Sequence, residues 1–186
     1  MNILLIISNI VLLAIILFFF KEFFNIIFRG YAPFISTRPR VLRKIFNEIN
    51  LNKDFCGQVY ELGCGRAGFL KTFGRHYPKA ELVGVEYSLW PWLITKIQQS
   101  LQKDARIKII KKNFYKVNLT EADIIYCFLN VDTMKKLKDK FRQECRTGTI
   151  IISYAFSLPD IKPDKVIKLE NKSKIFFYHW QNERAQ

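Results

Sequence analysis

VYELGCGRAG, residues 59–68, is a glycine-rich turn set between an apolar segment and an amphipathic one. Its glycines, Gly63, Gly65 and Gly68, form the pattern G-x-G-x-x-G. Glycines in this position let the backbone turn tightly and approach a ligand beyond the carboxyl end of a strand. The segment therefore predicts a strand, a ligand-binding loop and a helix in succession.

Two acidic residues discriminate between the ligands that such a loop accepts. Glu61 lies two residues before Gly63, where a carboxylate can meet the cationic amino group of a methionine moiety. Glu86 ends the apolar segment ELVGVE, about 20 residues after the glycines, where a carboxylate can accept both hydroxyls of a ribose. The pair favours S-adenosylmethionine over NAD, whose pyrophosphate would be repelled by Glu61. The alternative interpretation of either residue is a helix cap or a surface carboxylate.

Apolar segments typical of strands alternate with amphipathic segments typical of helices along the rest of the chain. We expect strands at residues 59–62, 81–86, 106–110, 123–129 and 149–156, and helices at residues 37–51, 68–77, 89–103 and 133–145. Thr37 is the predicted N-cap of the first of these helices. Such alternation is typical of an α/β fold, with a parallel sheet covered by helices on both faces.

The end of the chain follows another pattern. Two further strand-like segments, residues 165–169 and 175–180, are separated only by ENKSK, which has turn composition. No helix fits between them, so we expect an antiparallel hairpin. The prediction is a Rossmann-like methyltransferase fold, with a mostly parallel seven-stranded sheet and an antiparallel C-terminal hairpin.

The N-terminal segment is of a different kind. Residues 3–20, ILLIISNIVLLAIILFFF, contain no charge and only Ser8 and Asn9 as polar residues. Their length is close to the roughly 17–20 residues that a transmembrane helix needs. A cleaved signal peptide and a buried core helix are the alternatives, but no basic n-region or small-residue cleavage site is visible. We predict a transmembrane anchor at residues 1–30, with a hinge at residues 29–33, and a methyltransferase domain at residues 31–186.

The chain is strongly basic, with 30 lysines and arginines against 16 acids, a formal net charge of +14 and a pI of about 9.7. Such an excess points to nucleic acid or an anionic lipid surface, or else to a merely basic soluble surface. Cations also follow the apolar segment closely, at Lys21, Arg29, Arg38, Arg40, Arg43 and Lys44. By the positive-inside rule they place the domain on the cytoplasmic side of the membrane. Without an Arg/Ser-rich presequence, a bacterial or archaeal membrane is favoured over an organelle membrane.

The cysteines argue against a metal site and a disulfide framework. Cys56, Cys64, Cys127 and Cys145 are scattered without a C-x-x-C pair, and the chain has two histidines. This usage is typical of reduced thiols in a cytosol-like compartment. We expect all four to behave as small, partly buried apolar residues.

Several short segments together resemble a known family. They are PFIST (residues 33–37), ELGCG (61–65), GVE (84–86) followed by WPWL (90–93), and AFSLP (155–159) with Pro163 behind it. Residues 31–180 resemble the membrane-associated lysine methyltransferases of the ATP synthase c-subunit and the adenine nucleotide translocase, with their prokaryotic relatives. That family also carries an N-terminal hydrophobic segment. The chain departs from its pattern at Arg66 and Asn113, where acidic residues are usual, and at Glu61, which replaces an aspartate.

The resemblance implies S-adenosyl-L-methionine as the cofactor and a lysine of a membrane protein as the methyl acceptor. The residues that we expect to bind the cofactor are Thr37, Glu61, Gly63, Gly65, Gly68, Glu86, Tyr87, Asn113 and Phe114. Of these, Asn113 would bond the adenine edge with Phe114 beside the ring; a plain turn residue is the alternative for Asn113.

Aromatic faces can hold an ammonium group by cation–π attraction, so aromatic residues near the ends of the predicted strands are candidate walls of the acceptor pocket. They are Trp90, Trp92, Tyr115, Tyr126, Phe128 and Tyr154, although core packing is the alternative for each. No catalytic base is identified, and none is needed if the lysine arrives as a neutral amine. Methylation of a lipid or quinone headgroup, methylation of RNA, and a non-catalytic S-adenosylmethionine-binding module remain open.

Overall fold

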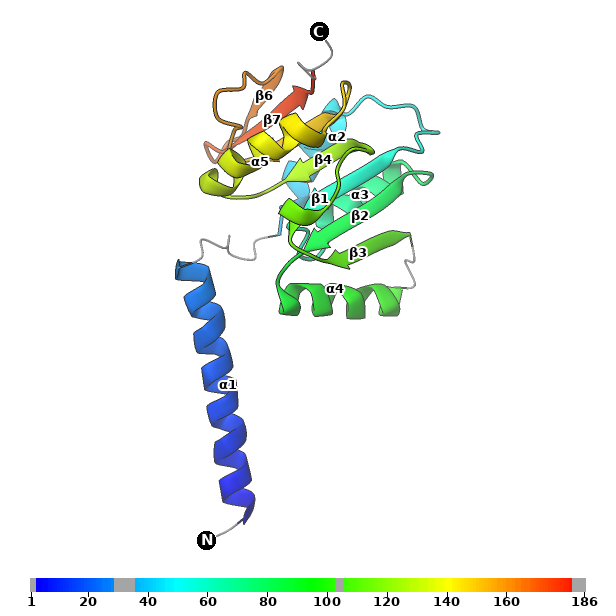
Figure 1. Cartoon of the computed structure of the whole chain (residues 1–186). Coiled ribbons are helices and arrows are strands. Elements are labelled where there is room, and N and C mark those ends of the chain that lie inside the picture. The colour runs from blue at the N-terminus through cyan, green and yellow to red at the C-terminus, as the bar shows by residue number, and fades with distance from the viewer. Residues whose placement is uncertain (1–2, 29–35, 103–105, 182–186) are drawn as a thin grey trace. The chain divides into compact units, whose positions relative to one another are not determined.

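The computed structural model describes residues 3–28, 36–102 and 106–181. The chain forms two compact units, Met1–Pro33 and Phe34–Gln186 (Figure 1). The predicted hinge at residues 29–33 lies outside the described residues, and so does Lys103 at the end of a predicted helix.

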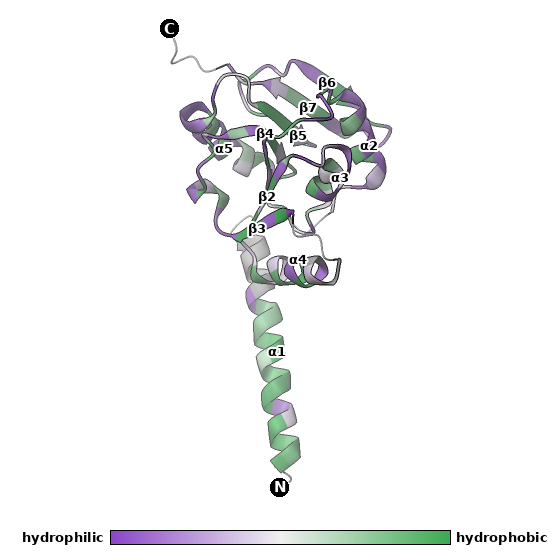
Figure 2. Cartoon of the chain, turned by 90° about the vertical axis from the view of Figure 1, so that its right-hand side faces the viewer, coloured by the Kyte–Doolittle hydropathy of each residue, from purple (hydrophilic) through white to green (hydrophobic). Residues whose placement is uncertain are grey.

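The described part of the first unit is one helix, α1 (Ile3–Phe28). Its segment Ile3–Lys21 is long and apolar enough to cross a bilayer, and none of that segment is buried in the structure. Figure 2 shows the ribbon of α1 coloured as hydrophobic over most of its length. The hydroxyl of Ser8 donates to the carbonyl of Leu5 at 3.0 Å, so this polar group has a partner within the helix. A signal sequence near the N-terminus meets the same criteria of length and composition, so α1 alone supports either interpretation.

The second unit is built on a seven-stranded sheet of order β3-β2-β1-β4-β5-β7-β6 (Figure 1). The strands are β1 (Gln58–Leu62), β2 (Glu81–Glu86), β3 (Ile107–Lys111), β4 (Ala122–Cys127), β5 (Ile150–Tyr154), β6 (Lys165–Lys168) and β7 (Lys174–His179). The first five are parallel to one another, whereas β7 pairs antiparallel with both β5 and β6. The predicted fold class, including the antiparallel hairpin, is confirmed.

The helices of this unit are α2 (Pro39–Glu48), α3 (Gly68–His76), α4 (Leu89–Gln102) and α5 (Val131–Glu144), with a short 3-10 helix η1 (Phe114–Lys116). Their order agrees with the sequence pattern, and their ends differ from it by a few residues. The N-cap predicted at Thr37 is wrong, because α2 begins at Pro39 and its N-cap position is Arg38. The start of α5 lies two residues before the predicted one, because Asn130 accepts the backbone N–H of Thr133 at 2.9 Å and caps the helix there.

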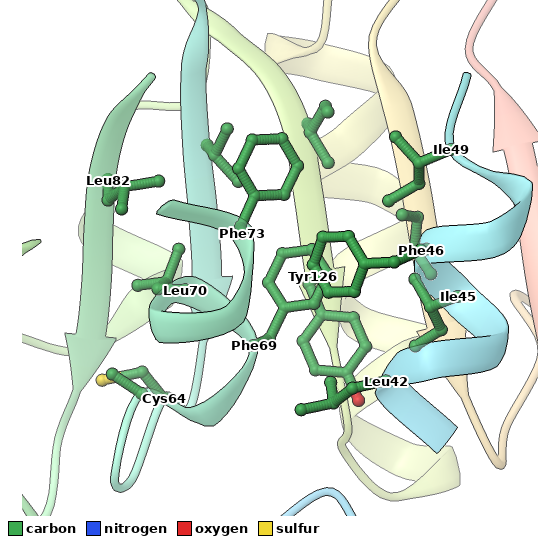
Figure 3. Close-up of a cluster of buried hydrophobic side chains, with 14 of the residues drawn as sticks. Leu42, Ile45, Phe46, Ile49, Cys64, Phe69, Leu70, Phe73, Leu82 and Tyr126 are labelled. Atoms are coloured by element: carbon green, nitrogen blue, oxygen red, sulfur yellow. The ribbon is translucent and has the colours of Figure 1, made fainter. Parts of the chain in front are cut away.

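Alternate residues of the strands serve two separate hydrophobic clusters, as the period of a β-strand requires. In β4, Ile124 and Tyr126 belong to one cluster and Ile125 and Cys127 to the other. The first cluster contains aromatic rings of α2, α3 and β4; the rings of Tyr126 and Phe69 stack at 4.3 Å (Figure 3). This packing places the start of α3 against the sheet, where the glycine loop precedes it.

The cysteine prediction is correct for three residues and wrong for one. Cys64, Cys127 and Cys145 are buried, whereas Cys56 is exposed. Cys56 lies before the first residue of β1, in a segment that no helix or strand covers. Burial raises the pKa of the Cys145 thiol to about 12, so this residue stays protonated at neutral pH.

Candidate functional site

The glycine loop, residues 63–67, joins β1 to α3 and turns as its pattern predicts. Gly63 and Gly65 have φ of 72° and 49°, and Ala67 is also left-handed at 54°. Glycine adopts such angles without steric cost. The backbone N–H of Gly63 donates to the carbonyl of Val85 at 2.8 Å. The loop is therefore a tight turn bonded to the end of β2.

Glu86 binds this loop through its side chain. The residue ends β2 and is 8% exposed. Its Oε2 accepts the backbone N–H of Gly65 at 3.0 Å, and its Oε1 accepts that of Ser88 at 2.8 Å. A carboxylate has about four acceptor positions, so capacity is left for further donors such as the two hydroxyls of a ribose. The glycine loop and the end of β2, which the sequence assigns to the same ligand, are thus joined by a direct hydrogen bond.

Glu61 lies on the adjacent strand and is also buried, at 6% exposure. Its Oε2 accepts the backbone N–H of Leu70 at 3.2 Å, in the first turn of α3, so the helix-cap role named as the alternative is present. Burial raises the pKa of Glu61 to about 8, and the negative charge of Glu86 adds to the rise. Two interacting carboxylates in a poorly solvated site favour a cation, because a positive charge stabilises their ionised forms.

The inner side of α4 fixes the glycine loop from another direction. The hydroxyl of Thr95, which is fully buried, lies within hydrogen-bonding distance of the carbonyl of Gly65 and, at 2.8 Å, of the carbonyl of Pro91. Gly65 is thus held at its N–H by Glu86 and at its carbonyl by Thr95. Sequence reasoning missed Thr95, since a threonine inside a helix commonly bonds only the carbonyl four residues before it.

The residues predicted to contact adenine follow β3. The backbone N–H of Lys112 donates to the carbonyl of Glu86 at 3.0 Å, which joins this segment to the end of β2. The Oδ1 of Asn113 accepts the backbone N–H of Tyr115 at 3.0 Å and caps η1, so its turn role is present. Phe114 is half-buried and Tyr87 is exposed.

Thr37 and Gly68, two of the predicted cofactor-binding residues, lie near the start of α3. The hydroxyl of Thr37 is 2.7 Å from that of Tyr126, whose ring stacks on Phe69. Gly68 is the first residue of α3, and a Cβ added to it would lie 3.5 Å from the Oγ of Ser36. The segment before α2 therefore lies against the start of α3, beside the glycine loop.

Three of the candidate acceptor-pocket residues belong to β4 and β5 or follow them. Tyr126 is 1% exposed and is a core residue. The rings of Phe128 and Tyr154 are 4.5 Å apart at the carboxyl ends of these strands. Phe128 and Tyr154 are thus positioned as a pair at the edge of the sheet that also holds the glycine loop.

The other candidates lie on α4 and η1. Trp92 is half-buried, and the Nζ of Lys111 lies 5.7 Å from the centre of its ring. Within the described residues, the buried Nε1 of Trp92 has no hydrogen-bond partner. Trp90 and Tyr115 are 45% and 36% exposed. Trp92 and Phe128 are both half-buried and pack against the hydrophobic cluster that contains Tyr154, whereas Trp90 and Tyr115 are exposed.

A hollow of about 450 Å³ adjoins the end of β5. It is lined by Val131, Ala155, Phe156, Ser157, Pro159, Lys172, Lys174 and Phe176. The AFSLP segment singled out in the sequence supplies four of these residues. Ala155 has a left-handed φ of 73°, held by a hydrogen bond of 2.8 Å from its N–H to the carbonyl of Lys174. Such strain is concentrated at functional sites in many proteins.

Known proteins similar to this chain are methyltransferases. The family model of the ANTKMT methyltransferase domain matches residues 61–165. The chain is 28% identical over 144 residues to a protein-lysine N-methyltransferase of Saccharolobus islandicus (strain REY15A), covering 76% of this chain and 87% of the relative.

Solved structures are similar in fold. An RNA methyltransferase from Salinibacter ruber in complex with S-adenosyl-L-homocysteine matches with a TM-score of 0.71 and 17% identity, over 77% of this chain and 92% of the other. A precorrin-6y C5,15-methyltransferase from Geobacter metallireducens GS-15 matches with a TM-score of 0.62 and 10% identity, over 81% and 92% of the two chains. At these identities the likeness establishes the Rossmann-like methyltransferase fold.

Proposed function

Because the chain belongs to the ANTKMT methyltransferase domain family, we propose that it transfers the methyl group of S-adenosylmethionine to the side-chain amine of a lysine in a membrane protein. Lysine as the acceptor is supported by the relative from Saccharolobus islandicus, which is a protein-lysine N-methyltransferase. A membrane location is supported by α1.

The observation that carries the cofactor assignment is the pair of buried carboxylates beside the glycine loop. Glu61 would bind the cationic amino group of the methionine moiety, and Glu86 the ribose hydroxyls. Between them, Gly63 and Gly65 have positive φ and no side chain, so the backbone leaves room for close approach. Asn113 and Phe114, after the neighbouring strand, would contact adenine.

S-adenosylmethionine, when bound, would supply a methyl carbon that a neutral amine attacks in line with the carbon–sulfur bond, so that a carbon–nitrogen bond forms as S-adenosylhomocysteine leaves. The chain would contribute alignment and exclusion of water, which can lower a barrier by several kcal/mol, on the order of 7–11 in the best-oriented systems. The Phe128–Tyr154 pair would hold the acceptor side chain. Apolar surroundings lower the pKa of a lysine, so less free energy is needed to bring it in neutral.

The proposed location puts the domain on the cytoplasmic side of a cell membrane. Lys21, Arg38, Arg40 and Arg43 follow the apolar segment, as the positive-inside rule requires for that orientation. The bilayer would contact residues 3–20. A lipid or quinone headgroup is equally accessible from such an anchor, and the similarity to a protein-lysine methyltransferase favours the protein acceptor.

Calorimetric titration of S-adenosylmethionine into the detergent-solubilised full chain tests the cofactor site. We expect micromolar binding that Glu86→Ala abolishes. Glu81→Ala is the matched control, since Glu81 lies on the same strand at its exposed opposite end, and it should bind like the native chain. Absence of binding by the native chain would overturn the proposal.

The acceptor is tested by incubating the chain with membrane extracts and methyl-labelled S-adenosylmethionine. Label that survives acid hydrolysis as methyl-lysine supports the proposal. Label that passes into the organic phase identifies a lipid or quinone acceptor, and label in RNA identifies a nucleic-acid substrate. Binding of the cofactor with no label in any fraction favours a non-catalytic module.

A further inference from the structure

The outer face of α4 is apolar. Leu89, Trp90 and Ile97 are 46%, 45% and 52% exposed. Leu89, the half-buried Leu93 and Ile97 follow at intervals of four residues, which places them along one side of the helix. The opposite side carries Thr95, whose hydroxyl is buried against the glycine loop. The half-buried Trp92 packs against a hydrophobic cluster, so α4 has apolar side chains on its inner side and a second, exposed apolar set on its outer side.

Helix α5 shows that this arrangement is particular to α4. Both helices have 14 residues. The buried residues of α5 include Met134, Leu137 and Phe141, and its exposed positions are mainly charged. That is the usual pattern of a helix between core and water. An outward stripe of leucine, tryptophan and isoleucine instead marks a surface that meets a partner.

The part of the sequence that contains the stripe is strongly basic. Residues 87–116 contain seven lysines and arginines and a single acid, Asp104. Lys96 lies on α4 itself, and Lys111, at the end of β3, has its Nζ near the ring of Trp92 on the same helix. Aromatic and aliphatic residues bordered by lysines are typical of helices that lie in the headgroup layer of an anionic membrane.

We propose that this outer face, formed by Leu89, Trp90, Leu93 and Ile97, docks on the surface of an anionic bilayer. The proposal rests on the membrane location proposed for α1 and adds a contact of a different kind. A tether limits how far the domain moves from the membrane, whereas docking through α4 fixes which side of the domain faces it. Because Thr95 joins α4 to Gly65, the docked helix also carries one side of the cofactor loop.

The test uses the full chain in vesicles whose lipids carry bromine on their acyl chains, which quenches tryptophan on contact. One set is phosphatidylcholine alone, and the other contains one third phosphatidylglycerol. The fluorescence of Trp90 is obtained by subtracting the tryptophan emission of the Trp90→Phe variant from that of the native chain. We expect at least twofold quenching of this signal in the anionic vesicles and little in the neutral ones.

Variants locate the contact. The double substitution Leu89→Ser with Ile97→Ser should remove the quenching of Trp90. Val166→Ser should not, since Val166 is an equally exposed apolar residue (41%) on β6, at the opposite edge of the sheet from β3. Circular dichroism of each variant checks that the fold is retained, and Trp90 quenching unchanged in a folded double variant would overturn the proposal.

Flotation and extraction by alkaline carbonate report on α1 separately. If the chain stays in the membrane but Trp90 is quenched in neither set of vesicles, the anchor is supported and docking is overturned. If carbonate extracts the chain but Trp90 is quenched, docking is supported and the anchor is overturned. If carbonate extracts the chain and Trp90 is not quenched, both the anchor and docking are overturned. Protection of the α4 backbone from hydrogen exchange would identify a protein partner if it rises with protein concentration in detergent, or if it appears only when a membrane protein is added. Either result would show that the outer face of α4 binds a protein, and would refute docking on lipid.

Discussion

At the scale of single residues, Glu61 has two roles with opposite demands. As a buried cap of α3 it is most stable protonated, since burial raises its pKa to about 8. As a ligand of a cationic amino group it would have to be ionised. The same residue thus links the stability of the free protein to the charge of its proposed cofactor.

This conflict predicts a pH dependence of stability. The folded pKa lies above the value of 4.5 expected for the unfolded chain, so the folded state retains the proton over that interval. The contribution of Glu61 to stability should therefore be full below about 4.5 and be lost as pH rises toward 8, by up to about 1.4 kcal/mol per pH unit. Glu61→Gln keeps an acceptor for Leu70 and removes the titration. Its unfolding free energy, measured with urea from pH 5 to 8, should exceed that of the native chain increasingly as pH rises.

The difference between the two proteins isolates Glu61, because the other carboxyls titrate in both. Parallel pH profiles would mean that Glu61 is ionised in the folded chain throughout, and that the burial seen here does not govern its charge. The profile is measured without S-adenosylmethionine, since a bound cation would itself lower the pKa of Glu61.

At the scale of the elements, the contact of α4 with the glycine loop carries a prediction. Thr95→Val keeps the shape of the side chain and removes the hydroxyl that faces Gly65. A buried carbonyl without its partner costs about 1–3 kcal/mol, so stability should fall by about that amount. Binding of S-adenosylmethionine should weaken severalfold, because Gly65 is then held at its N–H by Glu86 and no longer at its carbonyl.

The control for this change is Thr72→Val. The hydroxyl of Thr72 donates to the carbonyl of Gly68 at 3.0 Å, so it makes the same bond to the residue four positions earlier, and this bond lies within α3, after the loop of residues 63–67. It should lose stability slightly and bind the cofactor as the native chain does. If both variants lost cofactor affinity equally, the effect of Thr95 would come from its contribution to helix stability and not from its contact with the loop.

The sequence predicts the elements better than the contacts between them. Strand and helix periods are local, so all seven strands and the four helices around them were expected in the right order. The positions of Glu61 and Glu86 are also predictable from the sequence, because parallel strands bring their carboxyl ends to one edge of a sheet. Thr95 and the bond between Thr37 and Tyr126 are not, since they depend on how distant segments pack. The exposed apolar residues of α4 are not predictable from the sequence for the same reason, because which side of the helix is buried depends on that packing.

At the scale of the whole molecule, the chain separates two tasks. All the residues proposed to bind the cofactor lie in the unit Phe34–Gln186, which has both hydrophobic clusters of its own. The unit Met1–Pro33 contributes an apolar helix with no buried surface in its span. Methyl transfer chemistry and access to a membrane acceptor should therefore be separable by mutation.

A chain that lacks residues 1–33 tests this separation, once circular dichroism shows that it is folded. It should bind S-adenosylmethionine with the affinity of the full chain and methylate an acceptor solubilised in detergent at a similar rate. On intact membranes its rate should fall by tenfold or more, because a tether raises the effective concentration of enzyme at the bilayer. Fusion to an unrelated single-span helix should restore the rate, since the argument requires only the span. A truncated chain that loses cofactor affinity while remaining folded would contradict the separation and give α1 a part in the site itself.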